Sequence, residues 1–343
     1  MTNKLMLRLE DRNLPTLAKL LEVRLLGRYA STFCYNDPSH VYLELTARCN
    51  LRCGWCVQGH AGFRSDRAED MPFAMLQNIV PKLRGTRVLY LCLNGEPLLY
   101  EKIFDAVALA RRYVPSVRFV TNATLLTAEV GKELAKAGLS QLGVSIDSPD
   151  PELMQKIRCV SLAEVAENVR GFCADSGIPV EVRTAICAEN LASLKQLPAF
   201  VQSFGTCRLI YFTLAEGFAE VEASPMTMLH DREAFAATRG EILGQCRRLG
   251  LRTNLEYLEF YPDGFFERSR KGVCDALFGR HLAINNRGHI LPCCRYWGLQ
   301  LDSLADLPFD QAWNGRLTRD WRKAMLNRQY TGQCSNWCGF PAC

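Results

Sequence analysis

The sequence lacks the features that would assign it to several broad classes of protein. No apolar run approaches the roughly 18–20 residues that a membrane-spanning helix needs. The first residues, Met1-Thr2-Asn3-Lys4-Leu5, lack the apolar core and the cleavage site of a secretory signal. A net charge of +5, from 41 basic and 36 acidic residues, is too small and too scattered to indicate nucleic-acid binding. Repeats and low-complexity segments are also missing, so we expect a cytoplasmic globular protein.

Cysteine, by contrast, is abundant, with 16 in 343 residues. Disulfides are rare in the cytosol, so metal binding is the first explanation. Cys49, Cys53 and Cys56 form a C-x3-C-x2-C loop just after an apolar run at Val41–Leu45, which predicts a strand. Three thiolates on one loop can hold three corners of an iron–sulfur cubane and leave the fourth iron open for a small molecule. The alternatives are a zinc site and unrelated thiols, but zinc sites often use two C-x2-C pairs and only one occurs here.

This loop, with Trp55 just before its third cysteine, resembles the cluster loop of radical S-adenosylmethionine (AdoMet) enzymes. The resemblance implies that Cys49, Cys53 and Cys56 hold a 4Fe-4S cluster whose open iron chelates AdoMet. Reduction would split AdoMet into methionine and a 5'-deoxyadenosyl radical, which takes a hydrogen atom from the substrate. Trp55 would lie near the adenine.

Short β-rich runs alternate with helix-like segments from Val41 onward, which predicts an α/β fold with a parallel sheet. We expect strands near 41–47, 87–93, 116–121, 141–147, 179–186 and 207–214. We expect helices between them near 73–83, 102–113, 127–138, 162–175 and 190–203. Six such units fit the partial (β/α)6 TIM-like barrel of the family that the loop resembles.

The predicted organisation has four parts. Residues 1–39 form an N-terminal helical segment, 40–227 the barrel, 228–273 a linker with a helix near 228–250, and 274–343 a small cysteine-rich domain. An amphipathic stretch from about Leu14 to Arg28 is expected to pack on the main domain, with a membrane-surface helix as the alternative. Its apolar stripe would consist of Leu17, Leu20, Leu21, Leu25 and Leu26.

The second predicted strand is followed by Asn94-Gly95-Glu96-Pro97. Sites in parallel α/β folds form at the carboxyl ends of strands. The run resembles the Gly-Gly-Glu-Pro motif of the radical AdoMet family, with Asn94 in place of the first Gly. The resemblance implies that backbone and carboxylate acceptors of Asn94, Gly95 and Glu96 hold the ammonium group of AdoMet. An ordinary turn is the alternative.

Polar residues also end the next predicted strands. The resemblance places Asn122, Ser145 and Asp147 near the ribose of AdoMet, and Arg183 on the fifth strand would pair with its carboxylate. Strand-end caps and a surface ion pair are the alternatives for these residues.

The C-terminal segment carries six cysteines in a pattern that resembles the SPASM and twitch auxiliary-cluster domains of radical AdoMet enzymes. A Gly288-x4-Cys293 hairpin and the run Phe309-Asp310-Gln311-Ala312-Trp313-Asn314 support the resemblance, and a helix is expected near 308–328. A full SPASM domain has seven cysteines and two clusters, whereas the dense C-x2-C-x5-C-x3-C run is absent here. We therefore expect one auxiliary 4Fe-4S cluster, with structural zinc as the alternative. Its expected ligands are Cys274, Cys293, Cys334 and Cys338, with Cys294 and Cys343 as alternates.

The remaining cysteines are expected to be small buried hydrophobes. One of them could instead return a hydrogen atom to a substrate radical, as epimerases of this family do, and the candidates are Cys187, Cys207 and Cys246. If the substrate is oxidised, a base must take a proton. The candidates are Glu216, Glu256, Tyr257 and Glu259.

The expected function is a radical AdoMet oxidoreductase, because an auxiliary cluster can accept an electron from a substrate radical. About 39 residues before the first strand are too few for a leader-peptide-binding domain. This favours a small hydroxyl-rich metabolite, in natural-product or sugar biosynthesis, as the substrate. The alternatives are a ribosomal-peptide maturase, a radical epimerase, and a metal-binding interaction protein without catalysis. A flavodoxin or ferredoxin would supply electrons.

Overall fold

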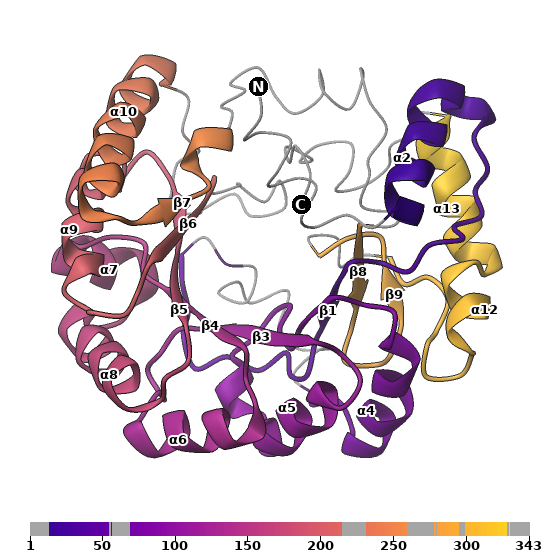
Figure 1. The fold of residues 1–343 in the computed structure, drawn as a ribbon, viewed down its shortest axis with the longest axis horizontal. Coiled ribbons are helices and arrows are strands. Elements are labelled where there is room, and N and C mark those ends of the chain that lie inside the picture. The colour runs from indigo at the N-terminus through magenta and orange to yellow at the C-terminus, as the bar shows by residue number, and fades with distance from the viewer. Residues whose placement is uncertain are drawn as a thin grey trace.

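One curved sheet of nine strands forms the frame of the molecule (Figure 1). The computed structural model describes residues 14–54, 56, 69–214, 231–258, 278, 280–294, 299–327 and 329. The strand order is β7-β6-β5-β4-β3-β2-β1-β8-β9. Among the strands of these described residues, neighbours from β7 to β8 run parallel, and only β9 is antiparallel. The mostly parallel α/β architecture predicted from the sequence is therefore confirmed.

The six predicted strands are all present. They are β1 (His40–Leu43), β2 (Val88–Tyr90), β3 (Ser116–Thr121), β4 (Gln141–Ser145), β5 (Val180–Ile186) and β6 (Leu209–Leu214). Three further strands extend the sheet: β7 (Arg252–Thr253) beyond β6, and β8 (His281–Ile284) and β9 (Ile290–Leu291) beyond β1.

Helices cover the outer side of this sheet (Figure 1). The predicted ones are α4 (Phe73–Ile79) with the 3₁₀ turn η3 (Val80–Leu83), α5 (Ile103–Arg111), α6 (Ala128–Ala137), α8 (Leu162–Asp175), η5 (Ser193–Gln196) with α9 (Leu197–Gln202), and α10 (Arg232–Leu249). A helix that we did not predict, α7 (Pro151–Arg158), lies between β4 and α8. A short 3₁₀ turn, η4 (Pro97–Leu99), follows the Asn94–Pro97 run, and another, η6 (Leu255–Tyr257), follows β7.

Alternation along the strands separates an apolar face from a polar one. Val41 and Leu43 of β1 are fully buried and join the core that α4, α5 and α8 share with the sheet. Residues between them, such as Tyr42, face the other side, where the Tyr42 ring stacks on Tyr90 of β2 at 4.8 Å. The barrel interior is consequently lined with polar and aromatic side chains. Its members include His40, Tyr42, Tyr90, Glu181, Arg183 and Tyr211.

The C-terminal hairpin is part of the barrel sheet. The predicted turn is present, with the Gly288 N–H donating to the Asn285 carbonyl at 2.9 Å and Gly288 at φ +82°. The parallel pairing of β8 with β1, from His40 opposite His281 to Leu43 opposite Ile284, was not predicted. The domain boundary at residue 274 is not tested by this pairing and stays a prediction.

The single helix predicted near 308–328 is two helices, α12 (Phe309–Trp313) and α13 (Arg316–Leu326). The break falls at Asn314 and Gly315. Asn314 leaves the helical path because its side chain accepts the Cys34 N–H at 2.7 Å and donates to the Cys34 carbonyl at 3.0 Å. The predicted Asp-x-x-Trp-Asn run thus ties the C-terminal part to the N-terminal segment.

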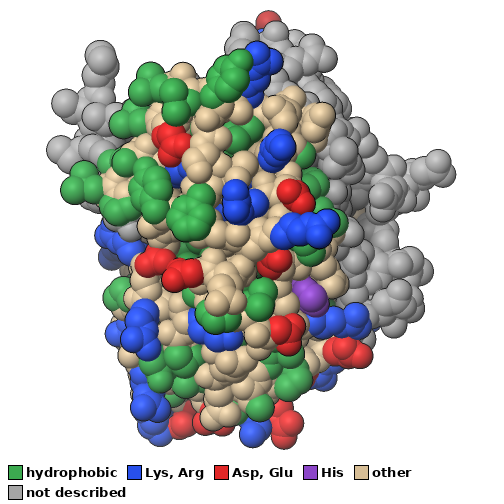
Figure 2. All heavy atoms as spheres, turned by 90° about the vertical axis from the view of Figure 1, so that its right-hand side faces the viewer, with side chains coloured by type: hydrophobic (Ala, Val, Ile, Leu, Met, Phe, Trp, Pro, Cys, Tyr) green, Lys and Arg blue, Asp and Glu red, His purple; other side chains and the backbone are tan. Residues whose placement is uncertain are grey.

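The N-terminal helix α2 (Leu14–Leu26) is present, but the predicted burial of its apolar stripe is wrong at Leu21, Leu25 and Leu26. Leu21 and Leu25 are 56% and 80% exposed, and Leu26 is exposed as well. Lys19 and Val23 turn inward instead, because the Lys19 amine donates to the Ser31 carbonyl at 2.6 Å and pairs with Glu22. Figure 2 shows hydrophobic side chains gathered on the side of the molecule that carries α2 and α13.

Within the described residues, no helix is long and apolar enough to cross a membrane.

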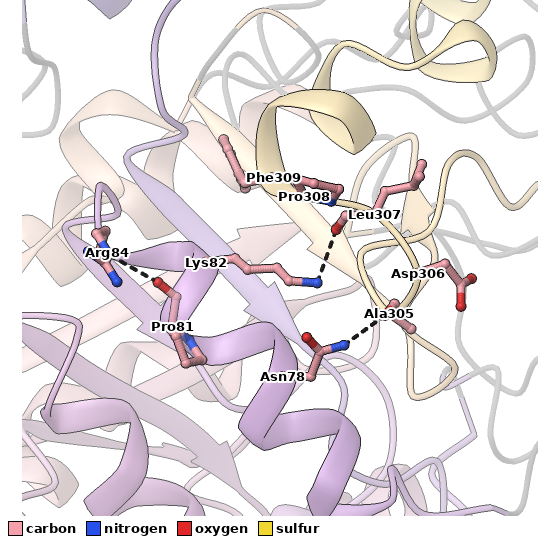
Figure 3. A pocket seen from close by; sticks show the side chains of 9 residues that line it. All are labelled: Asn78, Pro81, Lys82, Arg84, Ala305, Asp306, Leu307, Pro308 and Phe309. Atoms are coloured by element: carbon pink, nitrogen blue, oxygen red, sulfur yellow. Dashed lines mark hydrogen bonds between the residues drawn. The ribbon is translucent and has the colours of Figure 1, made fainter.

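A shallow pocket lies between η3 and the loop before α12 (Figure 3). The Lys82 amine donates to the carbonyls of Leu304 and Leu307, and the Asn78 amide donates to the Ala305 carbonyl. The polar groups of this pocket are therefore used to hold the C-terminal part on the barrel. Since η3 precedes β2, the pocket lies at the amino ends of the strands.

Candidate functional site

The cysteine loop leaves the carboxyl end of β1, where sites form in parallel sheets. Cys53 is buried and Cys49 and Cys56 are partly buried. The Leu51 N–H donates to the Cys49 sulfur at 3.4 Å, and the Cys56 N–H donates to the Cys53 carbonyl at 3.1 Å. Burial raises the pKa values of Cys49 and Cys53, so a metal would displace their protons on binding.

An ion pair holds the base of this loop. The Arg48 guanidinium donates two hydrogen bonds to the Asp70 carboxylate, at 2.9 and 2.6 Å, and a third to the Leu99 carbonyl at 2.7 Å. Asp70 also accepts the Thr46 hydroxyl at 2.6 Å. The two ends of the segment that carries the three cysteines are thereby fixed to each other and to η4.

The donor set of this loop is three thiols, which suits a cubane that keeps one iron open. Among the residues that the structure describes, no three His, Cys, Asp or Glu side chains gather as ligands of one metal ion would. In a cubane each thiolate binds a different iron, so the three sulfurs need not surround one point. Cys49, Cys53 and Cys56 would hold such a cluster, which supplies an electron to the molecule at its open iron.

Gly95 lets the Asn94–Pro97 run pass close to the cysteine loop. Its backbone has φ +72°, and a β-carbon there would lie 2.5 Å from the Thr46 carbonyl oxygen and 2.7 Å from that of Arg48. The neighbouring Glu96 N–H donates to the Arg48 carbonyl at 2.7 Å. Only glycine fits this position, which places the predicted AdoMet motif directly against the chain that leads into Cys49.

Glu96 links several backbone and side-chain groups at this edge of the barrel by hydrogen bonds. Its buried carboxylate accepts the Thr121 hydroxyl at 2.7 Å, the Asn122 N–H at 2.8 Å and the Leu98 N–H at 3.1 Å. Burial raises the pKa of Glu96, and these hydrogen bonds offset the rise only in part. The carboxylate therefore joins the ends of β2 and β3.

Asn94, the departure from the family motif, has a partner of its own. Its amide donates to the Glu44 carboxylate at 2.9 Å, and the other Glu44 oxygen accepts the Asn286 N–H at 3.3 Å. The Asn286 amide donates to the Glu69 carbonyl at 2.7 Å. Glu44 thus connects the predicted AdoMet motif with the turn of the C-terminal hairpin, a role that sequence reasoning missed.

Asn122 and Ser145 lie at the same edge, as expected. The Asn122 amide donates to the Asn50 side chain at 2.8 Å, and Asn50 in turn donates to Thr124 at 2.8 Å. Ser145 is half-buried and lies beside Arg183 in the register of β4 and β5. The predicted contacts of these residues with the ribose stay predictions.

Asp147 is fully buried and engaged with other protein groups. One oxygen accepts Arg158 Nε at 2.7 Å, and the other accepts the Ala185 N–H at 2.8 Å. Sequence reasoning missed Arg158 because it missed α7. The signal was present, since Asp150 caps that helix by accepting the N–H groups of Glu152 and Leu153, and Pro151 occupies its first turn.

Arg183 points into the polar face of the sheet. Its Nε donates to Glu181 at 2.5 Å, and its guanidinium lies 5.3 Å from the Tyr90 ring and 5.0 Å from the Tyr211 ring. Burial lowers its pKa, but the Glu181 carboxylate outweighs that effect and the net pKa is raised. A cation that stays charged here suits a carboxylate ligand.

The predicted auxiliary ligands are described only in part. Cys293 and Cys294 are half-buried after β9, and Cys293 packs against the hydrophobic core. Burial, and then the neighbouring Tyr90, raise the pKa of Tyr42 in the barrel interior. Several predicted site residues lie outside the described residues: Trp55, Cys274, Cys334, Cys338, Cys343, Glu216, Glu259 and the side chain of Tyr257.

The candidate hydrogen donors lie apart from one another. Cys187 follows β5, is fully buried and packs against Ile157 of α7. Cys207 precedes β6, and its thiol donates to the Val180 carbonyl at 3.3 Å, at the amino ends of the strands. Cys246 is buried on α10, and Glu256 is exposed in η6. Of the three candidate cysteines, Cys187 alone therefore lies at the edge that carries the cysteine loop.

Two family models match the chain. The model of the radical SAM superfamily matches residues 43–196, and that of SPASM, an iron–sulfur cluster-binding domain, matches residues 274–339. The chain belongs to the radical SAM superfamily. Membership implies a 4Fe-4S cluster that works with AdoMet, and the SPASM domain implies auxiliary iron–sulfur binding. The ligands and the number of auxiliary clusters stay predictions.

Two characterised relatives and one solved structure are similar to most of the chain. An AdoMet-dependent heme synthase of Nitratidesulfovibrio vulgaris is 24% identical over 318 residues, covering 85% of this chain and 82% of its own. A PqqA peptide cyclase of Xanthomonas campestris is 26% identical over 285 residues, 81% of this chain and 73% of its own. The crystal structure of Streptococcus suis SuiB bound to AdoMet has a TM-score of 0.67 at 16% identity, covering 88% of this chain and 71% of SuiB.

Proposed function

We propose that this radical SAM enzyme oxidises a peptide by two electrons, as a peptide maturase. The observation that supports oxidation is the position of the C-terminal iron–sulfur-binding region, which is joined to the barrel sheet. Its hairpin strand β8 pairs directly with β1, the strand that leads into Cys49. An electron acceptor built into the same sheet as the AdoMet site suits a reaction in which the substrate radical is oxidised.

The electron balance of this reaction is simple. With one electron from an external donor, such as a flavodoxin or ferredoxin, AdoMet bound at the cluster of Cys49, Cys53 and Cys56 would supply a radical that takes a hydrogen atom from a substrate C–H bond. A cluster held by the C-terminal cysteines would then accept one electron from the substrate, and a base would accept one proton. The substrate would lose two hydrogen atoms in all, which is a two-electron oxidation.

The residues of this chain have distinct roles in the proposal. Cys49, Cys53 and Cys56 hold the cluster, and the loop at Gly95 offers backbone carbonyls to the ammonium group of AdoMet. Glu96 already accepts three hydrogen bonds from the protein, so its role is to shape that loop. Arg183 pairs with the carboxylate of AdoMet.

The comparisons favour a peptide over the small hydroxyl-rich metabolite expected from the sequence. PqqA peptide cyclases from two genera match over 81–89% of the chain at 22–26% identity. SuiB bound to its precursor peptide SuiA shares the fold with a TM-score of 0.66. A metabolite is the second candidate, because BtrN in complex with AdoMet and 2-DOIA shares the fold over 94% of its length, with a TM-score of 0.52.

The test uses protein reconstituted with iron and sulfide without oxygen, then supplied with AdoMet and dithionite. Short peptides encoded beside the gene are offered in parallel with a set of aminocyclitols and sugars. We expect 5'-deoxyadenosine together with a peptide that has lost two hydrogen atoms. Turnover of a sugar or aminocyclitol alone would replace the peptide proposal by the metabolite one. The Cys49→Ala/Cys53→Ala/Cys56→Ala variant is the control and should form no 5'-deoxyadenosine.

The same triple variant tests the auxiliary cluster. We expect about four iron and four sulfide ions to remain bound per chain, held by the C-terminal cysteines. About eight of each would indicate two auxiliary clusters. Zinc in place of iron would contradict oxidation through this domain and would favour redox-neutral chemistry such as epimerisation.

A further inference from the structure

The end of α7 packs directly on the cysteine loop. The Gly54 N–H donates to the Ile157 carbonyl at 3.0 Å, and the Cys53 thiol donates to the Arg158 carbonyl at 3.8 Å. Arg158 also reaches the loop with its side chain, because Nη1 lies 4.0 Å from the Cys53 sulfur. One residue therefore contacts a predicted cluster ligand through both its backbone and its guanidinium.

The guanidinium of Arg158 is held in place from behind. Its Nε donates to Asp147 at 2.7 Å, and Asp147 is itself fixed by the Ala185 N–H of β5. Arg158 is 7% exposed and Asp147 is fully buried. The carboxylate and the sulfur meet different nitrogens of one rigid, buried guanidinium, so the positive charge faces the sulfur and cannot swing away into solvent.

We infer that Arg158 is a positioning residue that sets the reduction potential of the cluster at Cys49, Cys53 and Cys56. This inference rests on the proposed role of Cys53 as a ligand. A positive charge beside a ligand sulfur stabilises the reduced cluster, which carries one more negative charge, and it acts strongly because Arg158 and Cys53 are both buried. The Asp147 carboxylate limits that effect. Arg158 thus raises the reduction potential of the cluster, and the negative charge of Asp147 makes that increase smaller.

Three variants of the reconstituted protein test this inference. Arg158→Met removes the charge at similar length, Arg158→Lys keeps the charge without the planar fork, and Asp147→Asn removes the counter-charge. The readout is the midpoint potential, from a redox titration of the electron paramagnetic resonance signal that changes when AdoMet is added. We expect a lower potential for Arg158→Met, a higher one for Asp147→Asn, and a value for Arg158→Lys nearer to the unmutated protein.

Equal potentials in Arg158→Met, Asp147→Asn and the unmutated protein would overturn the inference, even if iron content or melting temperature changed. If Arg158→Met binds no cluster, Asp147→Asn decides alone, and an unchanged or lower potential in it counts against the inference. Failure of the proposed cluster-binding role of Cys49, Cys53 and Cys56 looks different. In that case the unmutated protein itself shows no AdoMet-sensitive signal, whereas failure of this inference leaves the signal and removes only the shifts.

Discussion

At residue scale, the approach of Gly95 to the carbonyls of Thr46 and Arg48 makes it sensitive to a single methyl group. Gly95→Ala adds the strain of a positive φ and a clash at 2.5 Å with a backbone atom. We expect a loss of about 3 kcal/mol or more in stability, and less iron bound per chain because the cysteine loop is displaced. Urea unfolding and iron analysis measure the two effects.

Gly177 provides a matched control for this substitution. It has a similar φ of +67°, but nothing lies within 4 Å of a β-carbon there. Gly177→Ala should therefore show only the backbone strain, about 1 kcal/mol, with unchanged iron content. Equal effects of the two substitutions would show that contact with the cysteine loop is unimportant.

The buried thiol of Cys246 predicts a loss of stability in alkali. Burial raises its pKa to about 11 from an ordinary value of 9.0. The protonated Cys246 thiol contributes fully to folding stability below the pKa that it has in the unfolded chain. This contribution is lost as the pH rises towards 11, because the unfolded chain releases the proton first. Between about pH 7.5 and pH 10 the unmutated protein should lose roughly 1–2 kcal/mol more than Cys246→Ala. Parallel losses in urea unfolding would contradict this.

At the scale of single elements, α7 supports the cysteine loop through its last turn. Asp150→Ala removes the N-cap that accepts two backbone N–H groups, and should cost about 1 kcal/mol. Because the Ile157 carbonyl and Arg158 contact the loop, a less stable α7 should also release its cluster faster to a chelator. The decay of the visible absorbance of the cluster measures that rate.

Removal of the N-cap of α10 separates the effect on stability from the effect on cluster release. Asp231 caps α10 by accepting the Ala234 N–H, and α10 packs against α9, η5, β7 and η6. Asp231→Ala should lower stability by a similar amount while leaving the rate of cluster loss unchanged. A faster loss in both variants would mean that global unfolding controls the release.

Elements whose pattern is local could be predicted from the sequence, and those that depend on distant partners could not. β5 and β6 were predicted nearly to the residue because their apolar runs are bounded by turns. The pairing of β8 with β1 joins residues about 240 apart, as in His40 opposite His281, and no local signal encodes it. The predicted burial of the apolar stripe of α2 was wrong in part for a similar reason. Lys19 is buried because its amine donates to the Ser31 carbonyl, outside the helix, and the helical pattern alone does not show that contact.

The same distinction applies to the candidate site. The thiols of the cysteine loop are recognisable by spacing, but the partners that hold the loop are not. Arg158 and Glu44 contribute through contacts with Cys53 and Asn286, which lie 105 and 242 residues away in the chain. Such contacts follow from the fold, so a single sequence does not reveal them.

At the scale of the whole molecule, Asn314 joins the two ends of the described chain. Its side chain bonds both backbone groups of Cys34 and accepts Arg322 Nη1 at 3.1 Å. Asn314→Ala leaves these groups without that partner and should cost about 2–4 kcal/mol of stability. Asn327, exposed at the end of α13, is the control, and Asn327→Ala should change stability by less than about 0.5 kcal/mol. Urea midpoints that fall equally would contradict the prediction.

The placement of β8 and β9 sets the distance between the end of β1 that leads to Cys49 and the end of β9 that leads to Cys293. The chain leaves β1 towards Cys49 at one edge of the sheet, whereas antiparallel β9 carries it towards Cys293 at the opposite edge. A cluster held by Cys293 would therefore stand off from the AdoMet site by about the length of a strand, ~13 Å for four residues. Backbone hydrogen bonds hold the ends of these strands at this spacing, so electron transfer between the two sites would need no relative movement of β1 and β8. The timing of oxidation would then depend on when the substrate arrives.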